Sequence, residues 1–194
     1  MTITALKEEV RKEALARRAA LQSEVPALSR RIAQIFADTI PIPPHSVVSA
    51  YVAIGDEADP APLLEILRAR GHVVALPRVV KRGLPLDFHV WESGAKLVPG
   101  GFGLSEPSRD WPKIAPDVLA VPLLGFDAKG YRIGYGAGFY DRTLAGLRAS
   151  KTVLAAGYCF RVQEFADLPH DENDQRLDWI VTEESARRLT TGPE

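Results

Sequence analysis

The chain has 194 residues, with 24 Lys and Arg against 25 Asp and Glu, which gives a formal net charge of -1. This balance argues against a protein whose main partner is nucleic acid, because such proteins usually carry a basic excess. Hydrophobic residues make up 46% and charged residues 25%, as in soluble globular proteins, so wholesale disorder is excluded. One cysteine and four scattered histidines exclude a disulfide scaffold and a Cys/His zinc site.

Membrane and export signals are also missing from the sequence. The longest apolar stretch, residues 118–126, is about half of the ~18–20 residues that a bilayer span requires. The N-terminus mixes both charges from Lys7 onward and has no apolar core of a signal peptide. We therefore expect a cytoplasmic protein that does not interact with membranes.

The first half of the chain predicts two helices followed by a strand–helix–strand unit. Apolar residues at helical spacing and proline breakers place the two helices at 4–22 and between Pro26 and Pro41. The unit that follows has strands at 47–53 and 73–76 around a helix that starts at Asp59-Pro60. Such a unit implies parallel strand pairing with a right-handed crossover.

The second half continues the alternation of strands and helices after a Gly- and Pro-rich middle. Its predicted elements are, in order, strands at 86–91 and 118–124, a loop at 125–138, a helix at 139–147, strands at 152–157 and 179–182, and a closing helix at 183–189. Alternating elements of this kind predict a layered α/β fold whose central sheet is mostly parallel and flanked by helices. We see no linker or repeat, so a single domain over residues 1–194 is expected.

The most informative segment connects the most apolar strand to the following helix, where parallel sheets bind ligands. Gly134, Gly136 and Gly138 alternate, so the backbone can turn tightly and present N–H groups to an anion beside the positive end of the helix. Arg132 and Arg142 bracket these glycines and can supply charge-assisted contacts. The segment fits neither the P-loop nor the dinucleotide fingerprint, and a turn that serves backbone geometry alone is the alternative.

This region resembles the signature of the 5-formyltetrahydrofolate cyclo-ligase family, also called 5,10-methenyltetrahydrofolate synthetases. The family reads V-P-x-L-x-F-D and then G-x-R-L-G-x-G-x-G-Y-Y-D. The chain has Val121-Pro-Leu-Leu-Gly-Phe-Asp and Gly130-Tyr-Arg-Ile-Gly-Tyr-Gly-Ala-Gly-Phe-Tyr-Asp. Further matches extend over nearly the whole chain, and they are Lys7 with Arg11, residues 51–57, Pro77-Arg78, residues 103–107 and residues 169–178.

The resemblance implies a fold like that of sugar-phosphate isomerases and CoA-transferases. It also implies ATP- and Mg²⁺-dependent conversion of 5-formyltetrahydrofolate into 5,10-methenyltetrahydrofolate, with release of ADP and phosphate. An N-formyl oxygen is a poor leaving group, and its phosphorylation lets N10 close the ring, so the protein mainly positions substrates and stabilises charge. We expect small-molecule partners only and a monomer.

The resemblance assigns roles to individual residues. The catalytic residues are Lys7, Arg11 and Arg132. The ATP-binding residues are Lys7, Arg11, Arg132, Ile133, Gly134, Tyr135, Gly136, Ala137, Gly138, Phe139 and Tyr140. The residues that bind the folate substrate are Val52, Glu57, Tyr135, Gly136, Ala137, Gly138 and Phe139. The residues associated with the metal are Asp141 and Asp174.

Each assignment has an ordinary alternative based on the residues alone. Lys7 and Arg11 would be solvated charges on a surface helix, and Glu57 would be a loop carboxylate. Asp141 and Asp174 would be a helix-start acid and a turn former. Two other functions stay open: an isomerase or CoA-transferase relative that needs no ATP, and a folate-binding module without catalysis.

Overall fold

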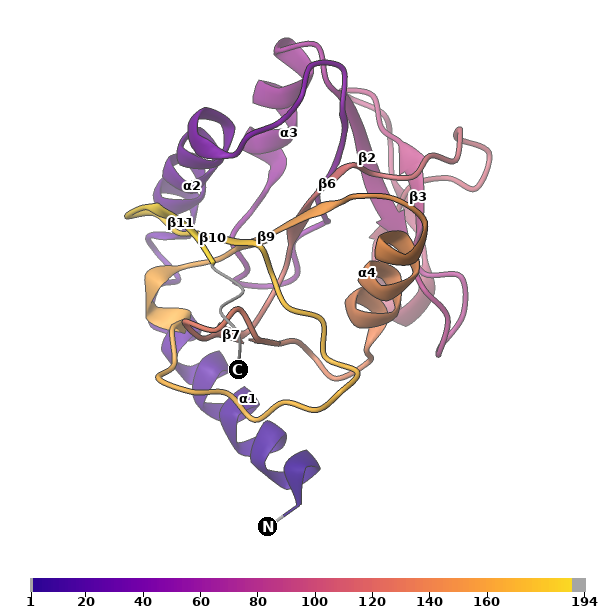
Figure 1. The fold of residues 1–194 in the computed structure, drawn as a ribbon. Helices are drawn as coiled ribbons and strands as arrows, with labels where there is room; N and C mark the ends of the chain where they lie inside the picture. The colour runs from indigo at the N-terminus through magenta and orange to yellow at the C-terminus, as the bar shows by residue number, and fades with distance from the viewer. Residues whose placement is uncertain (1, 190–194) are drawn as a thin grey trace.

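The computed structural model describes residues 2–189, and its main sheet has seven strands in the order β11-β10-β9-β6-β1-β2-β3 (Figure 1). They are β1 (Val47–Ser49), β2 (Val73–Arg78), β3 (Asp87–Val90), β6 (Val118–Val121), β9 (Leu154–Tyr158), β10 (Trp179–Val181) and β11 (Ala186–Arg188). Neighbours from β2 to β10 pair in parallel, and the edge strands β3 and β11 pair antiparallel. The predicted α/β fold with a mostly parallel sheet is confirmed.

Helices cover both faces of this sheet. The helices are α1 (Ile3–Ala19), α2 (Val25–Thr39), α3 (Ala61–Ala69) and α4 (Phe139–Ser150), and the last three cover the faces (Figure 1). In Figure 1, α2 and α3 lie on one side of the sheet and α4 on the other. Within residues 2–189, none of the helices has the length and apolar character that crossing a membrane requires.

Strand β6 shows how the sheet is joined to the helices on both of its faces. Its residues are all buried, and successive side chains of a strand point to opposite faces. Val118 and Ala120 belong to the apolar cluster under α2 and α3, whereas Leu119 and Val121 belong to the cluster under α4. A continuous apolar run is therefore what a strand covered on both faces requires, as the sequence predicted.

Helix α1 lies beyond the carboxyl ends of strands β6 and β9. It packs against β7 (Gly125–Phe126) and β8 (Arg132–Ile133), which follow β6, and against the 3-10 helix η2 (Arg161–Gln163), which follows β9. Ala14 in the middle of α1 is fully buried in a small cluster with Leu124, Ile133 and Leu168. This contact fixes α1 beside the loops in which ligands of parallel sheets bind.

The predicted closing helix at 183–189 is wrong. Residues 182–185 form a tight turn, in which Oγ1 of Thr182 accepts hydrogen bonds from the amides of Glu184 (3.3 Å) and Ser185 (3.4 Å). The chain then returns as β11, which pairs antiparallel with β10 at the edge of the sheet. A helix this short has little stability by itself, because nucleation is unfavourable, so pairing with the sheet edge prevails.

Other differences are smaller. The predicted strand at 47–53 is regular only in β1, and the segment that follows it is an irregular loop that carries Glu57. Two short hairpins were not predicted, β7 with β8 and β4 (Val98–Pro99) with β5 (Ser105–Glu106), the latter around the 3-10 helix η1 (Gly101–Gly103). Two-residue strands carry too little alternation to be detected in a sequence.

Candidate active site

The segment between β6 and α4 is shaped by a hairpin and a buried aspartate. β7 and β8 pair antiparallel, so the chain leaves the sheet and returns before residues 134–138, which we call the glycine loop. Asp127 is fully buried, and its Oδ1 accepts hydrogen bonds from the amides of Lys129 (2.9 Å) and Tyr131 (3.0 Å). Its Oδ2 accepts another from the amide of Leu168 (3.2 Å). Asp127 therefore fixes the turn that presents the glycine loop.

Two glycines give the glycine loop its shape. Gly136 has φ 94° and Gly138 has φ 67°, in the left-handed region that favours glycine. Arginines pack directly on both, since an added Cβ would lie 3.0 Å from Nη2 of Arg11 at the first and 2.7 Å from Nη1 of Arg142 at the second. Gly138 is also the N-cap of α4, whose first amides carry partial positive charge. Backbone amides, guanidinium groups and a helix N-terminus together make an anion-binding arrangement.

Helix α1 brings two cations to this region. Nε of Arg11 donates to the carbonyl oxygen of Gly134 at 2.9 Å. One turn earlier, the Lys7 ammonium pairs with Asp171 at 2.7 Å and with Asp174 at 2.6 Å. Burial opposes the charge of Lys7, but the hydrogen bonds and charges of the two aspartates outweigh it and raise the pKa of Lys7. Both side chains hold segments that are distant in sequence, and Arg11 also forms the helix-surface ion pair with Glu8 (2.8 Å) that the ordinary alternative describes.

Arg132 ties the expected metal aspartates to the same framework. Its Nη2 pairs with Asp141 at 2.7 Å, and its Nη1 donates to the carbonyl oxygen of Gln175 at 2.5 Å. The Gln175 amide in turn donates to Oδ1 of Asp141 at 3.1 Å. Asp141 thus lies against the residue that follows Asp174, so the structure brings the two aspartates onto adjoining segments. The side chain of Arg132 is buried within these contacts.

The carboxylates near the glycine loop fit a magnesium ion held partly by phosphate. Oδ1 of Asp141 and Oδ2 of Asp174 take the contacts described above, and the second oxygen of each carboxylate takes no part in them. Among residues 2–189 no group of three or more His, Cys, Asp or Glu side chains could hold a metal alone. Mg²⁺ is commonly bound through one or two carboxylates together with substrate phosphates, so a site for it does not require three protein side chains.

Glu57 lies in the loop after β1 and is only 4% exposed. Its Oε2 accepts a hydrogen bond from the Ile54 amide at 2.9 Å, and its Oε1 lies 3.8 Å from Nη1 of Arg18. Burial raises the pKa of Glu57, and the Ile54 amide and the Arg18 charge offset only part of this effect. Val52, expected beside it, packs half-buried against the core. The carboxylate is therefore anchored in a sheltered position, where hydrogen bonds are strong.

The aromatic and apolar residues of the segment have different surroundings. Tyr135 is 51% exposed, whereas the side chain of Ile133 is buried beside α1. Cζ of Arg142 lies 5.6 Å from the ring centre of Phe139. The Tyr140 hydroxyl is buried without a hydrogen-bond partner in the described part of the chain, and burial raises the pKa of Tyr140 above its usual range. Ile133 and Tyr140 thus offer a ligand their backbone rather than an exposed side chain.

Sequence reasoning missed Arg18 and Asp171. Arg18 pairs with Asp56 at 2.7 Å and donates to the Tyr135 hydroxyl at 2.8 Å, and Asp171 is the second partner of Lys7. A signal for Arg18 was present, because residues 7, 11 and 18 follow one face of a helix at steps of four and seven. Asp171 lies within the matched residues 169–178, but nothing local singled it out, because its partner Lys7 lies at the other end of the chain.

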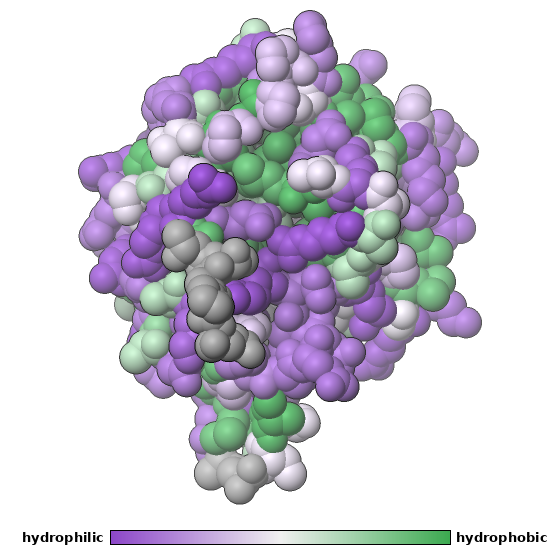
Figure 2. All heavy atoms as spheres, viewed as in Figure 1, coloured by the Kyte–Doolittle hydropathy of each residue, from purple (hydrophilic) through white to green (hydrophobic). Residues whose placement is uncertain are grey.

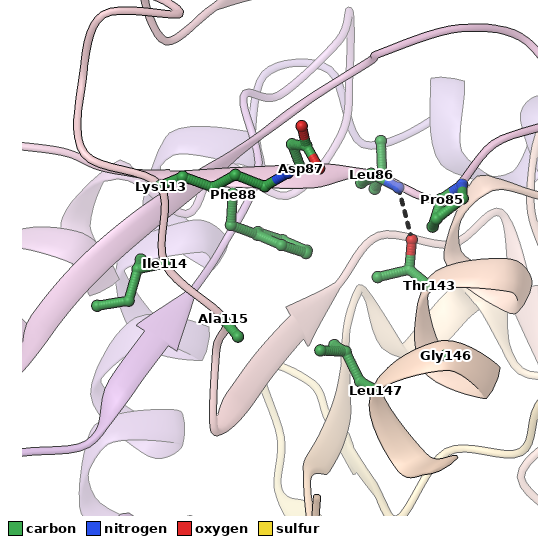
Figure 3. A pocket seen from close by; sticks show the side chains of 10 residues that line it. All are labelled: Pro85, Leu86, Asp87, Phe88, Lys113, Ile114, Ala115, Thr143, Gly146 and Leu147. Carbon is green, nitrogen blue, oxygen red and sulfur yellow. Dashed lines mark hydrogen bonds and ion pairs between the residues drawn. The ribbon is translucent and has the colours of Figure 1, made fainter. Parts of the chain in front are cut away.

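Two hollows flank these residues. One, of about 290 Å³, lies between β3 and α4 and includes Leu86, Phe88, Thr143 and Leu147 (Figure 3), and it contains none of the expected site residues. The other, of about 390 Å³, is lined by Gln22, Val25, Pro26, Gly55 and Asp56, where the α1–α2 junction meets the loop that carries Glu57. Figure 2 shows hydrophilic side chains over most of the face seen in Figure 1.

The chain is similar in sequence to a family of enzymes. The model of the 5-formyltetrahydrofolate cyclo-ligase family matches residues 3–183. The 5-formyltetrahydrofolate cyclo-ligase of Mycolicibacterium smegmatis is 37% identical over 70% of this chain and 72% of its own length. That of Escherichia coli K12 is 34% identical over 73% of this chain and 80% of its own length.

Solved structures give the same result. The 5,10-methenyltetrahydrofolate synthetase of Aquifex aeolicus superposes with a TM-score of 0.80 and 32% identity, covering 97% of this chain and 95% of that one. The synthetase of Mycoplasma pneumoniae, at 22% identity, shares the fold with a TM-score of 0.69 over 95% of this chain and all of that one. The chain therefore belongs to the 5-formyltetrahydrofolate cyclo-ligase family.

Proposed function

We propose that this enzyme converts 5-formyltetrahydrofolate into 5,10-methenyltetrahydrofolate and consumes ATP, with ADP and phosphate as the other products. The formyl oxygen takes the γ-phosphoryl group of ATP, N10 attacks the formyl carbon and loses its proton to solvent, and phosphate departs with the former formyl oxygen. Neither the nitrogen nucleophile nor the phosphoryl donor needs a covalent bond to the protein. The work of the protein is to hold both substrates in line and to stabilise charge on the transferred group.

The surroundings of the glycine loop, which lies between helix α1 and the start of α4, are the main support for this proposal. Its positive-φ glycines lie against the guanidinium groups of Arg11 and Arg142, and it leads directly into the N-terminus of α4. The triphosphate is proposed to bind along Ile133, Gly134, Tyr135, Gly136, Ala137, Gly138, Phe139 and Tyr140. Lys7 and Arg11 are proposed to approach its phosphates from α1, and Arg132 to hold the loop and Asp141 in place.

The folate is proposed to bind on the side of Glu57. A carboxylate can accept two hydrogen bonds from a pterin N–H and the neighbouring amino group. Glu57 is anchored by the Ile54 amide, and the residue before it, Asp56, lines a hollow that does not include Glu57 itself. Val52 and the glycine loop through Phe139 complete this side, so the formyl group would face the end of the triphosphate.

Asp141 and Asp174 are proposed to hold Mg²⁺ together with phosphate oxygens. The ion would neutralise charge on the phosphates during transfer. The chain contributes the setting: Arg132 and the Gln175 amide orient the Asp141 carboxylate, and Lys7 and the Asp171 amide orient that of Asp174. Because Lys7 already contacts Asp174, its ammonium would lie beside the metal-bound phosphates.

An absorbance assay of the methenyl product tests the proposal. Purified protein is mixed with 5-formyltetrahydrofolate, ATP and Mg²⁺, and each component is omitted in turn while ADP is measured in parallel. We expect product only in the complete mixture, with one ADP formed for each methenyl group. Product without ATP would favour an isomerase-like activity, and folate binding without product would favour a binding module. Either result would contradict the proposal.

The expectations of a single domain and of a monomer in the cytoplasm stay predictions.

A further inference from the structure

Arg18 is a buried cation that the proposed chemistry does not use. Its side chain is 2% exposed, although it lies on the same helix as Lys7 and Arg11. Buried arginines are rare unless they are paired, because removing a charge from water carries a large free-energy penalty. The surroundings of Arg18 therefore show what it holds in place.

Three segments of the chain meet at the Arg18 guanidinium. Its Nε and Nη2 bind Oδ1 of Asp56 at 2.8 Å and 2.7 Å, and its Nη2 also donates to the Tyr135 hydroxyl at 2.8 Å. Its Nη1 lies 3.8 Å from Oε1 of Glu57 and has no hydrogen-bond partner among residues 2–189. One side chain of α1 thus contacts both the glycine loop and the loop that carries the proposed folate carboxylate.

Tyr135 reaches the Glu57 loop through the Arg18 guanidinium, and the charge of Glu57 acts on its hydroxyl. Its hydroxyl accepts a hydrogen bond from Arg18. Burial is the main cause that raises the pKa of Tyr135, and the negative charge of Glu57 is the second. The other end of the Glu57 carboxylate is held by the Ile54 amide. Tyr135 is nevertheless 51% exposed. Its hydroxyl is therefore anchored inside the protein while part of its ring is available to a ligand.

We infer that Arg18 is a positioning residue that couples nucleotide binding to folate binding, by fixing Tyr135 of the glycine loop and Glu57 relative to each other. The inference rests on the proposed function, since it takes these two loops as the two halves of the site. A ligand that orders one loop orders the guanidinium contacts, and through them the other loop. The second ligand then meets a site that is already ordered and binds more tightly.

Binding of 5-formyltetrahydrofolate with and without a non-hydrolysable ATP analogue and Mg²⁺, measured by calorimetry, tests this coupling. We expect the parent protein to bind the folate about tenfold more tightly when the analogue is present, within the usual range of coupling between sites. Arg18→Met and Tyr135→Phe should each reduce this ratio to about one. Tyr135→Phe removes only the hydroxyl and keeps the ring, so it tests the coupling even if Arg18→Met does not fold.

Arg17→Met is the matched control. Arg17 is the neighbouring arginine of α1, is more exposed than Arg18 and has its contacts away from the site: its Nη2 pairs with Glu13 at 2.6 Å, and its Cζ lies 4.0 Å over the Phe165 ring. It should keep the parent ratio. A purely structural role of Arg18 would lower the melting temperature and weaken both ligands while leaving the ratio unchanged.

The possible results distinguish a failure of the inference on Arg18 from a failure of the proposed function. A parent ratio of one, or parent-like ratios in both Arg18→Met and Tyr135→Phe, would overturn the inference while the enzyme activity stands. A parent protein that binds neither ligand would overturn the proposed function, and the inference with it. Arg18→Lys keeps the charge but not the forked geometry, so we expect it to restore less than half of the parent ratio.

Discussion

Lys7→Met is expected to lower kcat by about 100- to 1,000-fold, the usual effect of removing one donor aimed at developing charge. The Lys7 ammonium lies between Asp171 and Asp174, on the helix that also carries Arg11 to the glycine loop. In the proposed site it neutralises charge on the transferred phosphoryl group beside the metal carboxylate. Methionine keeps most of the apolar stem and removes only the charge. The measurement is the rate of methenyl formation at saturating ATP and folate.

The fold should survive this change. The Lys7 ammonium and Asp174 are mostly buried, so losing the pair leaves the aspartates without their partner and is expected to lower the free energy of unfolding by about 1–3 kcal/mol, which a folded domain can tolerate. Lys12→Met provides the matched control, because Lys12 lies exposed on the same helix. It should turn over at the parent rate. A Lys7→Met protein with the parent kcat would show that the ammonium does not contact the reacting phosphate.

Asp141→Asn is expected to lower kcat at a fixed low Mg²⁺ concentration by about 10- to 100-fold, as is common when groups that hold or orient a metal are changed. Asparagine keeps an oxygen that can accept from Arg132 and from the Gln175 amide, so the local structure should be retained. What is lost is the negative charge that attracts the ion. Part of the rate should therefore return as Mg²⁺ is raised, and a Mg²⁺ titration of the rate measures this.

A surface aspartate gives the comparison for this experiment. Asp167 forms an exposed ion pair with Lys129 at 2.8 Å, and Asp167→Asn should leave both the rate and its Mg²⁺ dependence unchanged. If Asp141→Asn had the parent dependence on Mg²⁺, Asp141 would not be a metal-associated residue. Its carboxylate would then serve only to hold Arg132 and residue 175 against the start of α4.

The parallel core of the fold could be predicted because its signals are local. β6 is apolar on both faces, and Asp59 lies one residue before Pro60, the N-cap of α3, where its Oδ1 accepts the Ala61 amide at 2.9 Å. β11 could not be predicted, because its strand state depends on pairing with β10 rather than on residues 183–189. Propensity is a weak guide where a sheet edge offers hydrogen bonds.

In the candidate site, too, local features could be predicted from the sequence, whereas contacts between distant segments could not. The alternating glycines were visible in the sequence, but their spacing alone left a purely structural turn open, and left-handed angles explain Gly136 and Gly138. The partners of the charged residues were not evident, because Lys7 with Asp174 and Arg18 with Tyr135 are joined across most of the chain. A sequence shows that an arginine lies on one face of a helix, but only the fold shows which loops reach it.

The most direct measurement is a crystal structure of the protein with Mg²⁺ and a non-hydrolysable ATP analogue. We predict triphosphate oxygens within hydrogen-bond distance of the amides of residues 134–138, with the side chains of Lys7 and Arg11 in contact with them. A nucleotide bound in the hollow between β3 and α4, or one that leaves the glycine loop without a phosphate contact, would contradict this prediction.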